Sequence, residues 1–127
     1  MIAVDTSALM AILLGEKDAD SCVAVLESET ALLISAGTVA EALIVAARRK
    51  IGDEMTSLIG GLGFEIVSVT PAAAQRIACA YAKWGKGVHP AALNFGDCFA
   101  YEVAKDRGCP LLYVGDDFAK TDIKRPF

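Results

Sequence analysis

The chemistry of this chain is best sought in its carboxylates, because several of them stand where a strand should end or a helix should begin. Asp5 directly follows a short apolar run at the N-terminus, and Asp117 follows a second apolar run near the C-terminus. Glu41 and Asp97 fall in the first turns of two predicted helices. Because the carboxyl ends of parallel strands and the N-termini of the following helices share one edge of an α/β sheet, the four acids could meet there.

Four like charges in one place cost stability unless a cation neutralises them, and carboxylate oxygens are the ligands that Mg²⁺ and Mn²⁺ prefer. His89 is the only histidine, so no second imidazole is available for a zinc site. This set favours metal-assisted hydrolysis. We therefore expect Asp5, Glu41, Asp97 and Asp117 to be both the metal ligands and the catalytic residues, with Mg²⁺ as cofactor and Mn²⁺ as its substitute. The sequence leaves one ion or two open.

Each acid alone has a simpler interpretation as a helix cap. Asp5 stands where an N-cap would precede the next helix, and Thr38 with Glu41 has the spacing of a capping box. The joint occurrence of four acids at one predicted edge favours the metal site over four separate caps. Three further side chains could orient the carboxylates: Thr6, Ser7 and Asn94.

The elements that would position these acids alternate between strand and helix. Strands are predicted at Ile2–Val4, Ala31–Ser35, Phe64–Val69 and Leu111–Val114. Helices are predicted at Ala8–Leu14, Ala19–Ser28, Thr38–Lys50, Asp53–Ile59, Pro71–Trp84 and from Asn94 to Gly108, with a loop at Gly85–Leu93. This alternation predicts one α/β domain over residues 1–127, with a mainly parallel sheet of four to five strands flanked by helices on both faces.

The composition sets further bounds. The chain has 127 residues, of which 54% are hydrophobic, and no run is long enough to span a membrane. We expect a soluble, cytoplasmic protein with some apolar surface left for a partner. The net charge of -4 argues against binding nucleic acid by overall attraction, but a cation bound among the acids reverses the local sign.

Four sequence blocks resemble the successive motifs of PIN-domain ribonucleases, most closely the VapC-type toxins of bacterial toxin-antitoxin pairs. They are DTSAL at 5–9, SAGTVAEAL at 35–43, LNFGDCFAYEVAK at 93–105 and LLYVGDDFAKTDI at 111–123. The resemblance implies a three-layer PIN-like fold and a metal-dependent endoribonuclease that acts on RNA. It also implies a homodimer that is inhibited by a small antitoxin protein and forms a higher assembly with it.

The resemblance leaves the fourth acid between Asp116 and Asp117. In the motifs of the form Gly-x-Asp-Phe that this block resembles, the acid before phenylalanine is the fixed one, which favours Asp117. Phe118 should also pack inward and give Asp117 a defined direction.

Other surface features have two interpretations each. Lys83, Lys86 and His89 with Trp84 could contact RNA, although a solvated helix end is the simpler interpretation, and the same holds for Arg48–Lys50 at another helix end. The apolar face of the first two helices is mostly core, and part of it could be a groove for an antitoxin helix. Its residues are Leu9, Ile12, Leu13, Val23 and Leu26.

Two alternatives to a nuclease are compatible with part of the sequence. A receiver- or phosphatase-like α/β domain also gathers acids around Mg²⁺, but it would need an acid after the third strand, where Thr70 and Pro71 stand. A catalytically inactive PIN fold that only binds a partner is the other alternative. All four acidic positions being filled argues against it.

Overall fold

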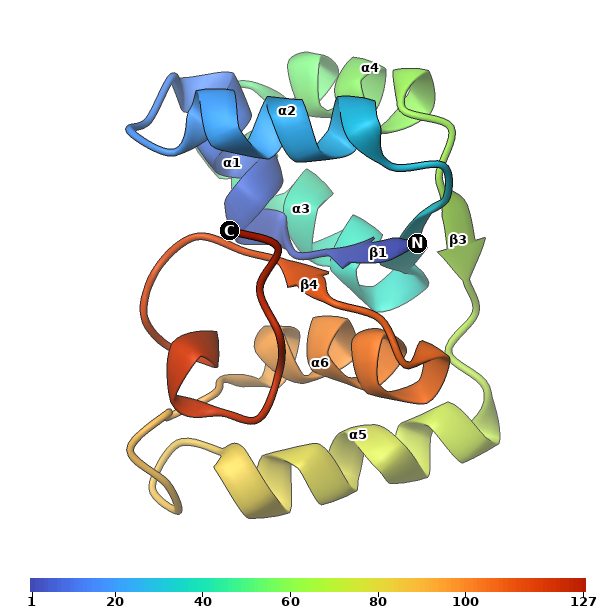
Figure 1. Ribbon diagram of the computed structural model, residues 1–127, viewed down its shortest axis with the longest axis vertical. Coiled ribbons are helices and arrows are strands. Elements are labelled where there is room, and N and C mark those ends of the chain that lie inside the picture. Colours follow the sequence, from blue (N-terminus) through green and yellow to red (C-terminus); the bar gives the residue numbers. More distant parts are fainter.

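The computed structural model describes residues 1–127 and is built on a four-stranded parallel sheet (Figure 1). The strands are β1 (Ile2–Val4), β2 (Leu32–Ser35), β3 (Glu65–Val67) and β4 (Leu111–Leu112), in the spatial order β3-β2-β1-β4. Ala3 of β1 is paired with Leu33 on one side and Leu111 on the other. The first strand of the chain is therefore a central strand, as the apolar run at the N-terminus predicts.

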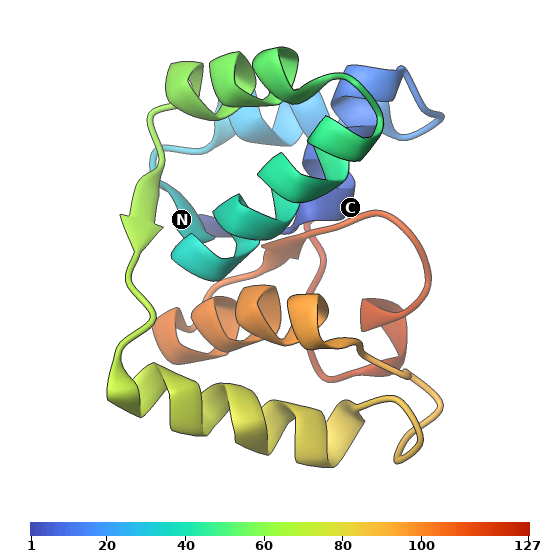
Figure 2. The ribbon, with the colours of Figure 1, turned by 180° about the vertical axis from the view of Figure 1, so that it is seen from behind.

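Six helices cover the sheet. They are α1 (Thr6–Leu14), α2 (Ala19–Ser28), α3 (Ala36–Arg48), α4 (Gly52–Gly61), α5 (Pro71–Trp84) and α6 (Phe95–Arg107). In Figure 1, α2 and α4 lie above the sheet and α5 and α6 lie below it. Figure 2 shows that α3 runs close to α6, with which it is in contact. The expected three-layer α/β fold is thus confirmed.

The sheet separates two apolar cores. Ile2 and Val4 of β1 belong to the core under α1 to α4, whereas Ala3 between them belongs to the core under α5 and α6. Leu33 on β2 likewise faces the second core while its neighbours face the first. This alternation is the period of two that a strand buried on both faces must have.

The predicted capping box of Thr38 and Glu41 is wrong. Helix α3 begins at Ala36, and its N-cap is Ser35, whose side-chain oxygen accepts a hydrogen bond from the Gly37 backbone N–H at 3.1 Å. Ser35 rather than Thr38 is the cap because β2 runs directly into the helix and leaves no loop before Thr38. Glu41 is consequently free for another contact.

Other boundaries differ in smaller ways. Helix α4 continues through Gly60 to Gly61, where the glycines had predicted an end, and β3 is shorter than the apolar run that predicted it. β3 is also an exposed edge strand, so little burial supports a longer one. None of the helices has both the length and the apolar character needed to cross a bilayer.

Candidate active site

Asp5 lies at the tip of β1 and is both a helix cap and a buried acid. Its Oδ2 accepts hydrogen bonds from the Ser7 backbone N–H at 3.0 Å and from the Ser7 hydroxyl at 2.6 Å. Its Oδ1 is buried and has no hydrogen-bond partner in the structure. The cap and the metal interpretations are therefore compatible, because each uses a different oxygen of the same carboxylate.

The pKa of Asp5 is raised to about 7 from an ordinary value of 3.8, chiefly because burial disfavours the charged form. The Ser7 hydrogen bonds oppose this shift, and the charges of Asp97 and Glu41 add to it. The two charges show that residues 36 and 92 positions away in the chain reach Asp5. An unpaired buried carboxylate of this kind has no cation among the protein's own side chains.

Ser7 also joins two strand tips. Its hydroxyl donates to Asp5 and accepts a hydrogen bond from the Val114 backbone N–H at 3.0 Å. The Asp5 carboxylate is thereby held against the segment that follows β4 and carries Asp116 and Asp117. This contact agrees with the orienting role expected of Ser7.

Glu41 reaches the site from the second turn of α3. Its Oε1 accepts a hydrogen bond from the Thr6 hydroxyl at 2.6 Å. Its carboxylate also lies directly against Gly96 on the first turn of α6, where a Cβ atom would overlap Glu41 Oε2. Glu41 is thus held between α1 and α6 by contacts that no local sequence pattern encodes.

Asp97 forms a capping box with Asn94 at the start of α6. The Asn94 side chain accepts from the Asp97 backbone N–H at 2.8 Å, and Asp97 Oδ2 accepts from the Asn94 backbone N–H at 2.9 Å. The pKa of Asp97 is raised to about 6, first by burial and then by the charges of Glu41 and Asp117, against the effect of the Asn94 hydrogen bond. The charge effects link all four predicted acids into one group.

Asp116 and Asp117 are both exposed side chains that follow Gly115, yet they differ in their neighbours. Asp117 is the one whose charge raises the pKa of Asp97. Phe118 is 3% exposed and packs on Tyr113 with ring centroids 5.2 Å apart, as expected from the sequence. The geometry thus favours Asp117 over Asp116 as the fourth acid.

The four acids match the chemistry of a divalent cation site but are not preformed as one. No three side chains among His, Cys, Asp and Glu form a preformed metal cage. The unpartnered Oδ1 of Asp5 is nevertheless the kind of atom that a cation would satisfy, and further carboxylates lie near enough to raise its pKa. All the donors are oxygens, which fits Mg²⁺ or Mn²⁺. The oxygen donors therefore fit such an ion in their chemistry, although they are not arranged as a preformed cage.

Two glycines at the crossing of α3 and α6 contribute to the site, although no pattern in the sequence predicted this role. A Cβ on Gly37 would overlap the ring of Phe99, just as one on Gly96 would overlap Glu41. Each glycine accepts a side chain of the other helix, so the two helices approach closely where Glu41 and Asp97 must meet. The only signal in the sequence is that each glycine stands in a first helical turn close before an acid.

Trp84, which the sequence analysis assigned either to RNA contact or to a helix end, makes contacts within the fold. Trp84 donates a hydrogen bond from Nε1 to the Tyr101 hydroxyl at 2.9 Å and packs edge-on against His89. The His89 Nδ1 accepts from the Ala91 backbone N–H, so the loop after α5 is internally bonded. These contacts favour the simpler interpretation of Trp84 and His89.

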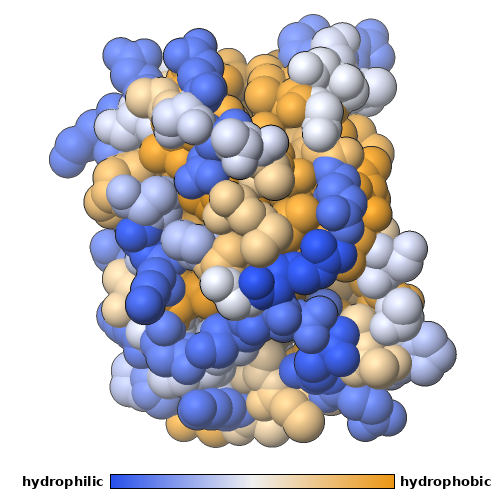
Figure 3. Space-filling view, turned by 45° about the vertical axis from the view of Figure 1, so that its right-hand side comes forward, coloured by the Kyte–Doolittle hydropathy of each residue, from blue (hydrophilic) through white to orange (hydrophobic).

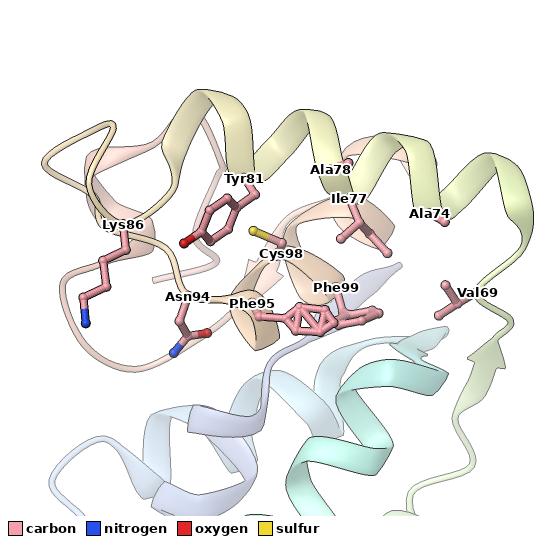
Figure 4. Close-up of a pocket in the computed structure, with 10 residues that line it drawn as sticks. All are labelled: Val69, Ala74, Ile77, Ala78, Tyr81, Lys86, Asn94, Phe95, Cys98 and Phe99. Carbon is pink, nitrogen blue, oxygen red and sulfur yellow. The ribbon is translucent and has the colours of Figure 1, made fainter.

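Two apolar grooves lie outside the acidic cluster. The α5–α6 groove has a volume of about 610 Å³, and in Figure 4 Ile77 and Tyr81 point from α5 toward α6, where Phe95 and Phe99 lie side by side. The α2–α4 groove has a volume of about 340 Å³. It is lined mainly by Ile12, Val23, Leu26, Leu32, Leu58 and Leu62. Figure 3 shows hydrophobic surface between hydrophilic rims at this end of the molecule.

Comparisons with known proteins define the class. The model of the PIN domain matches residues 2–124, and the chain belongs to the PIN-domain family. Ribonuclease VapC30 of Mycobacterium tuberculosis is 40% identical over 125 residues, which cover 96% of this chain and 95% of the relative. Membership in this family removes the receiver-like alternative.

Solved structures agree on the fold. VapC20 of Mycobacterium tuberculosis, described as a sarcin-ricin loop cleaving toxin, has a TM-score of 0.78 at 16% identity, covering 97% of this chain and 96% of that one. A toxin-antitoxin complex from Klebsiella pneumoniae has a TM-score of 0.71 at 19% identity, covering 96% of this chain and 93% of that one.

Proposed function

We propose that this chain is a divalent-metal-dependent endoribonuclease and the toxin of a toxin-antitoxin pair. The observation that carries the proposal is the buried Asp5 carboxylate. Its Oδ1 has no hydrogen-bond partner, and the neighbouring charges, Asp97 and Glu41, are also negative. The relatives named as ribonucleases support the reaction class. Hydrolysis of RNA phosphodiester bonds is the reaction that accounts for both the acidic cluster and the relatives named as ribonucleases.

Asp5, Asp97, Glu41 and Asp117 would hold the ion, Mg²⁺ or Mn²⁺. When bound, the ion would lower the pKa of a water molecule and neutralise charge on the phosphoryl oxygens. The Ser7 and Thr6 hydroxyls donate hydrogen bonds to the Asp5 and Glu41 carboxylates, respectively. The Asp97 carboxylate accepts a hydrogen bond from the backbone N–H of Asn94 rather than from its side chain. These bonds restrict the carboxylates before RNA arrives, which is the benefit of a supported ligand.

A protein partner is the natural means of control for such an enzyme. Structural neighbours solved as toxin-antitoxin complexes support an antitoxin partner, and the α2–α4 groove is the place we propose for an apolar antitoxin helix. This groove contains Ile12, Val23 and Leu26 of the face expected from the sequence.

The homodimer is a separate proposal. Phe95 beside the α5–α6 groove is 64% exposed, and Ile44 on the neighbouring α3 is 58% exposed. Apolar side chains this exposed are common at interfaces between subunits, so we propose that a second copy covers this face. A dimer would carry two acidic sites and could bind two antitoxin molecules.

The proposed function is tested by Asp5→Asn. Asn caps a helix about as well as Asp and carries no buried charge, so the variant should fold at least as stably as the metal-free parent while losing a ligand charge. We expect RNA cleavage to be lost, and we expect Mn²⁺ to raise the melting temperature of the parent but not of the variant. Asp20→Asn, on the exposed side of α2, is the matched control.

Cleavage by Asp5→Asn at the parental rate, or cleavage by the parent that persists in EDTA, would contradict a metal site at Asp5. A parent that binds Mn²⁺ but cleaves no RNA alone would instead support the inactive binding module.

A further inference from the structure

The segment that carries Asp117 has almost no regular structure of its own. Between β4 and the C-terminus the only element is η1 (Phe118–Lys120), a single 3₁₀ turn. The Asp117 side chain is exposed and forms no hydrogen bond in the structure. Contacts elsewhere in the segment must therefore hold Asp117 near Asp97.

After Asp117, Asp122 supplies a directional contact to α6, in addition to the hydrogen bond from the Val114 backbone N–H to Ser7 that precedes Asp117. Its Oδ1 accepts a hydrogen bond from the Tyr101 hydroxyl at 2.7 Å, and its Oδ2 accepts one from Lys105 Nζ at 3.0 Å. Both donors belong to α6. The burial of Phe118 is a second anchor, but apolar contact has no direction, whereas two hydrogen bonds define where the backbone lies.

The spacing along α6 connects this contact to the acidic cluster. Asp97, Tyr101 and Lys105 are four residues apart in turn, so they lie along one face of the helix. The segment follows that face, with Asp117 near Asp97 and Asp122 bound one and two turns further on. A shift of Asp122 along α6 would therefore displace Asp117.

The contacts of the Tyr101 hydroxyl favour donation of its proton to Asp122. It accepts a hydrogen bond from Trp84 Nε1 at 2.9 Å, which leaves its own proton for Asp122. Burial, followed by the bond to Asp122, raises the pKa of Tyr101 to about 12, so the hydroxyl remains a donor at neutral pH. Trp84 and Tyr101 thereby extend the anchor of the segment to the end of α5.

We propose that Asp122 is a positioning residue, which through Tyr101 and Lys105 fixes the Asp117 carboxylate beside Asp97. The proposal rests on the function proposed above, in which Asp117 is a metal ligand. It assigns a task to the last acid of the GDDFAKTDI block, which the four-carboxylate site leaves unexplained.

The test is a double-mutant cycle read by Mn²⁺ binding, measured from the electron paramagnetic resonance signal of free Mn²⁺. Asp122→Ala should raise the dissociation constant about tenfold, the lower end of the usual effect of losing a residue that orients a ligand. In the Asp117→Asn background, Asp122→Ala should cause no further loss, because it acts through Asp117.

Two variants separate positioning from loss of charge or of the fold. Asp122→Asn removes the charge but keeps an acceptor for Tyr101, so it should bind Mn²⁺ nearly as well as the parent. Tyr101→Phe keeps the ring and loses only the hydroxyl, so it should weaken Mn²⁺ binding by about as much as Asp122→Ala. This variant tests the same contact if Asp122→Ala fails to fold. Glu65→Gln, which weakens the ion pair with Arg107 on another side of α6, is the control and should change nothing.

An unchanged dissociation constant in both Asp122→Ala and Tyr101→Phe would overturn the proposal, as would an equal loss with and without Asp117. A failure of the proposed function is distinguishable, because Asp117→Asn alone would then leave Mn²⁺ binding unchanged. That result would overturn the positioning role together with the ligand role.

Discussion

At the scale of single residues, the site is a set of acids whose charges are not balanced by the protein. Asp5 and Asp97 have raised pKa values because they are partly or fully removed from water and face other carboxylates. A cation bound among these acids would neutralise their charges. Because such a ligand would bind only the folded state, it would stabilise the fold.

The stability of the metal-free protein should depend on pH through Asp5. Its pKa is about 7 in the folded chain and close to the ordinary 3.8 in the unfolded chain. Between these values the folded state retains a proton that the unfolded state has released, so the free energy of unfolding falls as the pH rises. In EDTA, the melting temperature should decrease from about pH 5 to about pH 7.5.

Asp5→Asn removes the titration of Asp5 and should make the decrease shallower, while Asp97, whose pKa is raised to about 6, keeps part of it. Added Mn²⁺ should stabilise the parent more at the higher pH. Differential scanning calorimetry measures both effects. An identical pH dependence in the parent and in Asp5→Asn would show that Asp5 is ionised in the folded protein at acidic pH.

The choice between Asp116 and Asp117 is also decided by single residues. Asp117 is adjacent to the buried Phe118 and its charge raises the pKa of Asp97, whereas Asp116 is not adjacent to Phe118 and does not contribute to that shift. Asp117→Asn should lose at least about tenfold in RNA cleavage, or about 1.4 kcal/mol of transition-state stabilisation, and Asp116→Asn should retain most of it. Assays of both folded variants at saturating Mn²⁺ give the ranking, and the reverse order would assign the role to Asp116.

At the scale of elements, the alternation of strands and helices could be predicted from the sequence because it depends on local patterns. The apolar run 2–4 predicted the central strand, and Asn94 predicted the cap of α6. The capping box at Thr38 failed because two equally good caps, Ser35 and Thr38, stand close together. Only the end of β2 decides between them.

The contacts that complete the site could not be predicted in the same way. The Glu41 carboxylate packs against Gly96, 55 residues away in the chain. Asp122 accepts a hydrogen bond from Tyr101, 21 residues away. Such contacts depend on the angle at which two elements meet, which a local pattern does not contain. The sequence therefore predicted which acids gather but not what holds them.

The crossing of α3 and α6 makes a prediction at this scale. Ala is a better helix former than Gly by roughly 1 kcal/mol, so Gly96→Ala would stabilise an isolated helix. Here its methyl group would overlap the Glu41 carboxylate and displace it. We expect a folded variant with RNA cleavage reduced by about a hundredfold, the usual result of an ångström-scale displacement at a reacting centre.

Gly60→Ala in α4 is the matched control, because nothing lies within 4 Å of the added Cβ. That variant should keep full activity and melt at a slightly higher temperature. Full RNA cleavage and unchanged Mn²⁺ binding by Gly96→Ala would show that Glu41 can move without consequence.

At the scale of the whole molecule, the acidic site and the α2–α4 groove are built on different parts of the fold. The acids lie at the carboxyl edge of the sheet, whereas the groove lies between two helices above one face. Catalysis and recognition of the antitoxin should therefore be separable by mutation. A mutation in a groove that binds the antitoxin should abolish antitoxin binding without changing RNA cleavage. A mutation in a groove that is only part of the core should not do so.

Val23 and Ala24 offer a matched pair on α2. Val23 lines the groove, while Ala24 is exposed and lies outside it. A carboxylate at position 23 would be buried without a partner when an apolar helix docks, which is costly, whereas one at position 24 would remain in water. We expect Val23→Glu to abolish copurification with the antitoxin from its own operon, so that co-expression no longer prevents growth arrest. Ala24→Glu should remain neutralised, and both purified variants should cleave RNA at the parental rate. If the antitoxin binds and neutralises both variants equally, it docks elsewhere on the molecule.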